Sequence, residues 1–139
     1  MESNSEDVSS LFSEYWEWIS VLLFLFITAD LLTTMYAASI HGAFLEGNPI
    51  IRWGLEQNII LLTAMNLLVG FLCVGFFYAI LLNIEQAPNK YYSKLLLSFE
   101  VFLGLLISVG IFVFINNIFV IFFGSSLFSE IPAWIQSFL

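Results

Sequence analysis

The chain has 139 residues, 60% of them hydrophobic and only 10% charged, and its mean hydropathy is +0.98. This composition lies far outside the range of soluble globular domains and indicates an integral membrane protein. The formal net charge of -8 excludes nucleic acid as a partner, because that binding needs basic patches. The expected partners are membrane lipids and a membrane protein or a second copy of the chain.

Three segments are long and apolar enough to cross a bilayer, which takes roughly 20 residues per helix. They cover about residues 18–40, 59–82 and 92–115. Residues 1–14 are acidic and are expected to form a disordered cytoplasmic tail. The sequence therefore predicts an all-α membrane bundle that forms a single domain over residues 1–139.

Two alternatives stay open for residues 118–139. This stretch is apolar but is interrupted by Gly124, Glu130 and Pro132. It forms either a fourth span or a broken helix in the membrane interface.

The few basic residues suggest an orientation. With three spans, Lys90 and Lys94 lie on the same side as the N-terminus, whereas Arg52 lies in the opposite loop. Because lysine and arginine are enriched in cytoplasmic loops, the N-terminus is predicted to be cytoplasmic.

Each span carries small and polar residues at helical spacing, so that they share one face. In the first span these are Asp30, Thr33, Thr34, Ala37, Ala38 and His41. In the second they are Thr63, Asn66, Gly70 and Cys73, and in the third Glu100, Gly104 and Ser108. Such faces let membrane helices approach closely and bond across the contact. The three faces are therefore predicted to meet in one three-helix contact.

Counting residues from the ends of the spans places Asp30 and Asn66 at a similar height. We expect these two to pair, with Ser108 joining them and Glu100 forming a second polar point nearer the cytoplasm. An acid at such a depth usually faces a partner or a water-filled cavity.

A short interfacial helix is predicted after the first span. Gly42 and Gly47 permit turns, and Asn48 followed by Pro49 is a strong helix start. Glu46 precedes this helix N-terminus, where a carboxylate is favoured by the helix dipole.

The same residues resemble the signature of a known family. D-x-x-T-T (Asp30, Thr33, Thr34), then Gly42, then E-x-N-P (Glu46, Asn48, Pro49) is similar to an uncharacterised family of small bacterial and archaeal membrane proteins, catalogued as a domain of unknown function. A further asparagine near the end of the third span, Asn116 or Asn117, extends the resemblance. Asn66 stands where a lysine is expected. The resemblance implies a prokaryotic cell membrane but no activity.

Three functions are compatible with these features. The favoured one is a structural or accessory partner in a membrane complex, with Asp30 in a helix contact.

The alternative is a cation- or proton-binding protein, related to transport if several copies assemble. Its candidate ligands for a divalent cation are Asp30, His41, Glu46 and Asn48, whose oxygens and imidazole suit metals such as Mg²⁺ or Zn²⁺. The least favoured is a lipid-acting enzyme with Asp30 or Glu46 as general base. The chain offers neither a nucleophile–histidine pair nor a phosphate-binding loop, which counts against an enzyme. No cofactor is predicted apart from the candidate divalent cation.

Overall fold

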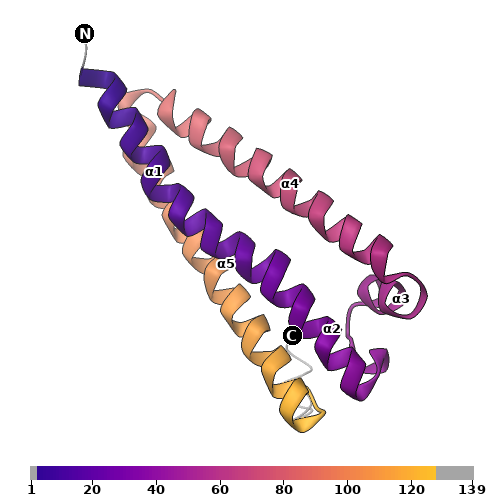
Figure 1. Cartoon of the computed structure of the whole chain (residues 1–139). Coiled ribbons are helices and arrows are strands. Elements are labelled where there is room, and N and C mark those ends of the chain that lie inside the picture. The colour runs from indigo at the N-terminus through magenta and orange to yellow at the C-terminus, as the bar shows by residue number, and fades with distance from the viewer. Residues whose placement is uncertain (1–2, 128–139) are drawn as a thin grey trace.

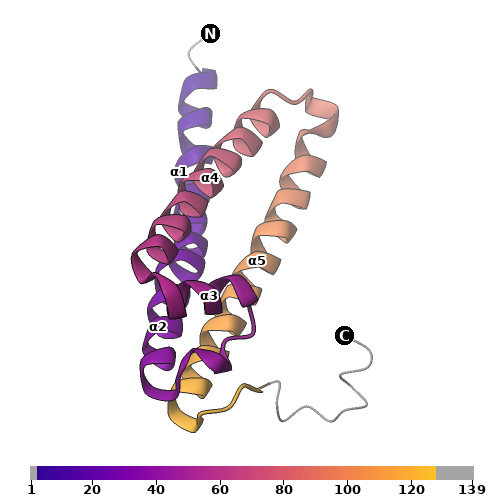
Figure 2. The same cartoon turned by 90° about the vertical axis from the view of Figure 1, so that its right-hand side faces the viewer.

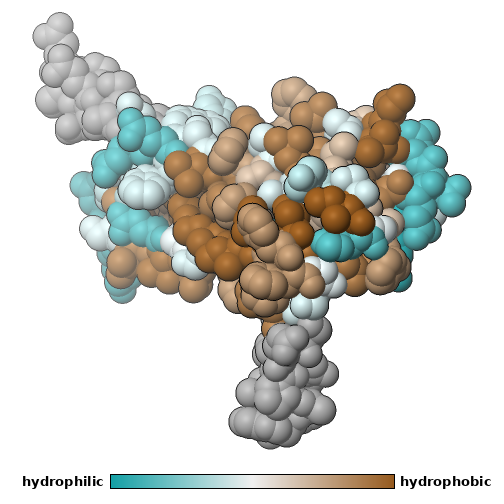
Figure 3. Space-filling model, turned by 60° about the horizontal axis from the view of Figure 1, so that its bottom comes forward, coloured by the Kyte–Doolittle hydropathy of each residue, from teal (hydrophilic) through white to brown (hydrophobic). Residues whose placement is uncertain are grey.

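The computed structural model describes the backbone of residues 3–127 and the side chains of residues 13–127. In this part of the chain it contains three helices that are long and apolar enough to cross a membrane: Ser13–His41, Ile59–Glu85 and Asn89–Phe123. Apolar side chains cover the middle of the face shown in Figure 3, and polar ones lie at its two ends. The predicted all-α membrane bundle is confirmed.

The first span is one long helix with an irregular centre. It consists of α1 (Ser3–Leu23), a π-helical segment η1 (Phe24–Ala29) and α2 (Asp30–His41). In η1 the hydrogen bonds skip one residue more than in an α-helix, and the N–H of Asp30 donates to the carbonyl of Leu25. α1 begins at Ser3, so the helix includes most of the acidic segment that the sequence predicts to be disordered.

The predicted short helix after the first span is present as α3 (Pro49–Gln57). The Asn48 side chain accepts a hydrogen bond from the N–H of Ile50, and Pro49 occupies the first turn. Gly54 lies against the second span: a Cβ atom there would be 2.9 Å from the Cβ of Leu62. Gly54 therefore allows α3 to pack closely against α4.

The second and third spans are α4 (Ile59–Glu85) and α5 (Asn89–Phe123). The Asn58 side chain caps α4 by accepting from the N–H of Leu61. α5 continues about two turns beyond the expected end near residue 115, so residues 118–123 belong to the third span. It ends at Gly124, whose φ of 67° is in the left-handed region. The predicted C-terminal helix or fourth span otherwise falls largely on residues 128–139, which lie outside the described residues.

The bundle has a packed end and an open end. α1–α2 and α5 run side by side in the same direction, while α4 meets them near the N-terminus and diverges toward α3 (Figures 1 and 2). The core lies at the first end and consists of Tyr15, Ile19, Leu22, Phe77, Leu81, Ile84, Phe99 and Leu103. At the other end, α2, α3 and the last turns of α5 enclose polar residues and cavities.

Candidate functional site

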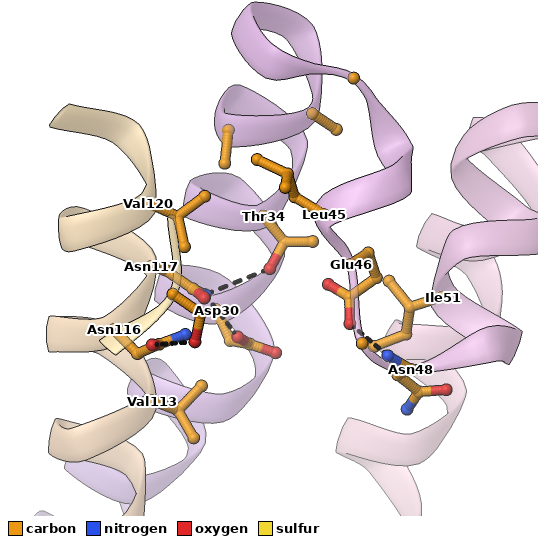
Figure 4. A pocket seen from close by; sticks show the side chains of 15 residues that line it. Asp30, Thr34, Leu45, Glu46, Asn48, Ile51, Val113, Asn116, Asn117 and Val120 are labelled. Atoms are coloured by element: carbon orange, nitrogen blue, oxygen red, sulfur yellow. Dashed lines mark hydrogen bonds between the residues drawn. The ribbon is translucent and has the colours of Figure 1, made fainter. Parts of the chain in front are cut away.

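A cluster of polar side chains joins the first span to the third. The Asn117 amide group donates to Asp30 Oδ1 at 2.9 Å, to Thr33 Oγ1 at 3.0 Å and to Thr34 Oγ1 at 3.2 Å. Thr34 is buried, and Figure 4 shows Asp30 and Thr34 of α2 facing Asn117 of α5. An amide carries only two hydrogens, so three oxygens share them.

Helical spacing explains why these oxygens converge. Asp30, Thr33 and Thr34 are three and four residues apart and so lie on one face of α2. The Thr33 hydroxyl also donates to the carbonyl of Ala29 at 2.7 Å, which fixes its orientation. The face therefore presents acceptors toward α5.

Asn66 does not form the predicted pair with Asp30. Its amide donates to the carbonyl of Ile27 in η1, at 2.6 Å, rather than to Asp30. Gly70, one turn further along α4, also packs against Ile27, since a Cβ there would be 3.5 Å from that side chain. The polar face of the second span therefore contacts the π-helical segment.

The loop before α3 is held by its own hydrogen bonds. Glu46 Oε1 accepts from the N–H of Asn48 at 2.7 Å. The Arg52 guanidinium donates to the Glu46 carbonyl, from Nε at 2.9 Å and also from Nη2. These bonds position the Glu46 side chain relative to the helix start.

A cavity of about 530 Å³ separates this loop from α2 and α5. We call it the polar cavity. Its polar lining residues are Asp30, Thr34, Glu46, Asn48, Asn116, Asn117 and Ser126. The Glu46 carboxylate lies on the side of the loop that faces Asp30 (Figure 4). Among the described residues that line the polar cavity there is no lysine, no arginine and no aromatic residue.

His41 does not line the polar cavity with the other metal candidates. Its Nε2 is 3.0 Å from the Ile121 carbonyl, and its ring packs against Gly124. His41 thus joins the end of α2 to the end of α5. Within residues 13–127 no group of three or more His, Cys, Asp or Glu side chains is placed to hold a metal ion.

A second cavity, of about 300 Å³, lies on the other side of Asp30, among α2, α3 and α4. We call it the side cavity. Asp30, Thr34, Asn48 and Ile51 line both cavities. The remaining lining of the side cavity is mostly apolar and consists of Leu31, Ile50, Leu62, Met65, Asn66 and Val69.

The third span forms its second polar point with α1. Tyr15, which is buried, donates its hydroxyl to Glu100 Oε1 at 2.5 Å. Glu100 itself is exposed and borders a groove of about 380 Å³ together with Gly104. Ser108 is also exposed and bonds the Gly104 carbonyl of its own helix, so it does not join Asp30.

Gly110 takes the helix-contact role that was expected of Gly104. A Cβ at Gly110 would lie 2.9 Å from the Phe26 ring, whereas a Cβ at Gly104 would meet nothing within 4 Å. The face of α5 that meets the first span is therefore rotated away from the predicted one.

Sequence reasoning missed the bond from Tyr15 to Glu100 and the role of Asn117 as the partner of Asp30. Asn117 was indicated only through the resemblance, as one of two adjacent asparagines, and it was placed beyond the end of the third span. The available signal was the apolar sequence on both sides of Asn116 and Asn117, which keeps the helix in the membrane.

A comparison with known protein families matches residues 21–123 to a model described as a domain of unknown function (DUF5658). The matched range contains both cavities except for Ser126. Neither the curated proteins nor the solved structures contain a match.

Proposed function

The chain belongs to the DUF5658 family, a domain of unknown function, and we propose that it is a membrane protein that binds a small cation in the polar cavity. The observation that carries this proposal is that Asp30 and Glu46, from α2 and the following loop, line one cavity. The cation would present hydrogen-bond donors, as a protonated primary amine or a hydrated metal ion does.

Electrostatics support a positively charged ligand. Asp30 lies in an apolar span, where charges interact strongly and are costly without compensation. Asn117 supplies a neutral donor, and the Arg52 guanidinium donates to the Glu46 carbonyl. A cation between Asp30 and Glu46 would compensate both carboxylates.

The size and lining of the polar cavity narrow the ligand class. About 530 Å³ is within the usual range of small-molecule sites and far exceeds the volume of a bare metal ion. Carboxylate, amide and hydroxyl oxygens accept hydrogen bonds from ammonium groups or metal-bound water. Quaternary ammonium groups are usually recognised by aromatic rings, which are absent from the described lining.

Thermal unfolding of the full chain in detergent tests the proposal. We expect ethylammonium or Mg²⁺ to raise the midpoint and tetramethylammonium to have no effect at equal ionic strength. A ligand at 100 times its Kd stabilises a protein by about 2.7 kcal/mol. Glu46→Gln should abolish the shift, and Asp30→Asn should reduce it.

Glu56→Gln is the matched control, because Glu56 is exposed on α3 and does not line the polar cavity. It should retain the full shift. Equal shifts in the Glu46→Gln and Glu56→Gln variants would contradict the proposal, and so would the absence of a shift with both cations.

A second candidate function, accessory subunit of a membrane complex, is favoured by Glu100. This acid lies six residues beyond Lys94, roughly 9 Å deeper in α5, yet it is exposed in the single chain. A carboxylate facing lipid is costly, and the adjacent Gly104 leaves room for another helix. A neighbouring helix that covers Glu100 would remove this cost.

The size of the tagged protein, extracted from its native membrane in mild detergent, tests the accessory function. We expect a complex larger than the monomer, which Gly104→Leu disrupts. Gly75→Leu is the control, since Gly75 on α4 also has open space around it. A wild-type protein that migrates as a monomer rules this function out.

A further inference from the structure

We propose that the ligand is an amphiphilic amine, with its ammonium group in the polar cavity and its hydrocarbon chain in the side cavity. This inference rests on the proposed cation site and adds the class of molecule that the site takes. It is supported by two features: the polar cavity and the mostly apolar side cavity share lining residues, and Asp30 is one of them.

The two cavities adjoin, because four residues line both. Asp30 and Thr34 of α2 form one part of the shared lining, and Asn48 and Ile51 form the other. An ammonium group bonded to Asp30 therefore lies beside the start of the side cavity. A chain attached to that ammonium group would enter the side cavity between the shared residues of α2 and Ile51.

The side cavity is suited to hydrocarbon. Leu31, Leu62, Met65 and Val69 supply apolar walls. Met65 and Val69 are 41% and 50% exposed on α4, so this end of the side cavity opens to the lipid-facing surface. An alkyl chain can enter from the bilayer while the polar cavity receives the charged end.

The charges exclude one large class of amphiphilic amines. Phosphatidylethanolamine carries an anionic phosphate next to its ammonium group. That phosphate would lie close to Asp30 and Glu46, and the described lining of both cavities contains no lysine or arginine to compensate it. The favoured ligand is an amine on a hydrocarbon chain without an adjacent phosphate.

The experiment compares ethylammonium with hexylammonium in the purified full chain. Thermal shift titrations give the affinity of each, and the readout is the ratio of the two affinities. A buried CH₂ group contributes about 0.8 kcal/mol, so four such groups favour the longer amine by at most about 200-fold. Part of this preference is lost to competition from the detergent, so all variants are measured in the same detergent at the same concentration.

Met65→Trp fills the side cavity and should lower the hexyl-to-ethyl affinity ratio about tenfold while ethylammonium still binds. Leu67→Trp is the control, because Leu67 is similarly exposed on α4 but does not line the side cavity. Val69→Phe provides a second filling variant if the first does not fold. Short-chain phosphatidylethanolamine should fail to displace hexylammonium.

The outcomes separate this inference from the function on which it rests. An unchanged affinity ratio in the filled variants overturns the amphiphile while leaving the cation site intact. Displacement by phosphatidylethanolamine also overturns it. Failure of both amines to bind the wild-type chain, while Mg²⁺ still shifts its midpoint, overturns the amphiphile alone. Failure of both amines and of Mg²⁺ overturns the cation site itself.

Discussion

At the scale of single residues, Asn117 determines how Asp30 is accommodated in the membrane. Its amide bonds the carboxylate and both threonines of α2. Hydrogen bonds between membrane helices contribute on average about 0.6 kcal/mol each, and an acid left without a donor in a span costs more than one such bond. The effect of losing Asn117 should therefore exceed that of losing an ordinary amide.

We predict that Asn117→Leu destabilises the protein by about 1–3 kcal/mol, because it removes the hydrogen bond from the Asn117 amide to the Asp30 carboxylate. Asn83→Leu is the control, since Asn83 is exposed and bonds only a carbonyl of its own helix. Unfolding in detergent measures both. The double variant Asp30→Leu, Asn117→Leu should recover part of the loss, and additive effects would contradict the pairing.

At the scale of elements, the π-helical segment η1 sets the rotation of α2 relative to α1. Tyr15 and Asp30 bond α5 at positions 100 and 117. Each residue of an α-helix is rotated by about 100° about the helix axis from the one before it. If the first span were a regular α-helix, the direction of Asp30 would be rotated about 60° forward from that of Tyr15, whereas on α5 Asn117 is rotated about 100° backward from Glu100. The extra residue in a π turn changes this rotation, so that Asp30 is about 40° backward from Tyr15. Both helices then turn in the same sense along their contact, so both bonds can form.

Deleting Phe24, whose side chain is exposed, should convert η1 to a regular α-helix. The deletion should lower the unfolding midpoint strongly, because one of the two bonds to α5 is then out of phase. Phe24→Ala removes the same side chain without changing the rotation and should have a small effect. Equal unfolding midpoints for the two variants would show that η1 does not set the rotation of α2 relative to α1.

Close packing of α5 against η1 gives a second prediction for this element. Gly110→Leu should destabilise the protein by about 1–3 kcal/mol, because the new side chain overlaps the Phe26 ring. Gly104→Leu should have little effect on the isolated chain, since nothing lies within 4 Å of its Cβ position. Chemical unfolding in detergent distinguishes the two, and a reversed order would place the helix contact on the Gly104 face.

At the scale of the whole molecule, the two ends of the bundle differ in packing and in polarity. The buried core lies at the end that contains the start of the first span and the turn between α4 and α5 (Figure 1). The polar cavity and the side cavity lie at the other end, beside α3. The buried core thus lies at one end, and the two adjoining cavities, which are the kind of place where ligands bind, lie at the other.

We predict that the cavity end faces away from the cytoplasm, because Lys90 and Lys94 lie at the opposite end. In a Cys73→Ser background, Gln57→Cys should react with a membrane-impermeant maleimide in intact cells. Gln86→Cys, in the α4–α5 turn, should react only after lysis. The opposite labelling pattern would show that the cavity end faces the cytoplasm.

Sequence patterns were sufficient for the spans and the short helix, because hydropathy and the Asn48–Pro49 start are local signals. The site was predicted only in part. Glu46 and Asp30 were both singled out, and they line one cavity. Asn66 was paired with Asp30 by counting depth, which gives height but no rotation. The rotation depends on η1, and a π turn within an apolar run leaves no evident pattern of side chains.

The bond between Asp30 and Asn117 also has a consequence for how the protein is made. These residues are 87 positions apart in sequence. At synthesis rates of about 5–20 residues per second, Asp30 leaves the ribosome about 4–17 s before Asn117. During that interval the first span holds its acid without its eventual donor. The first span is therefore less stable in the bilayer during this interval than in the finished bundle, and assembly is complete only when the last span has been made.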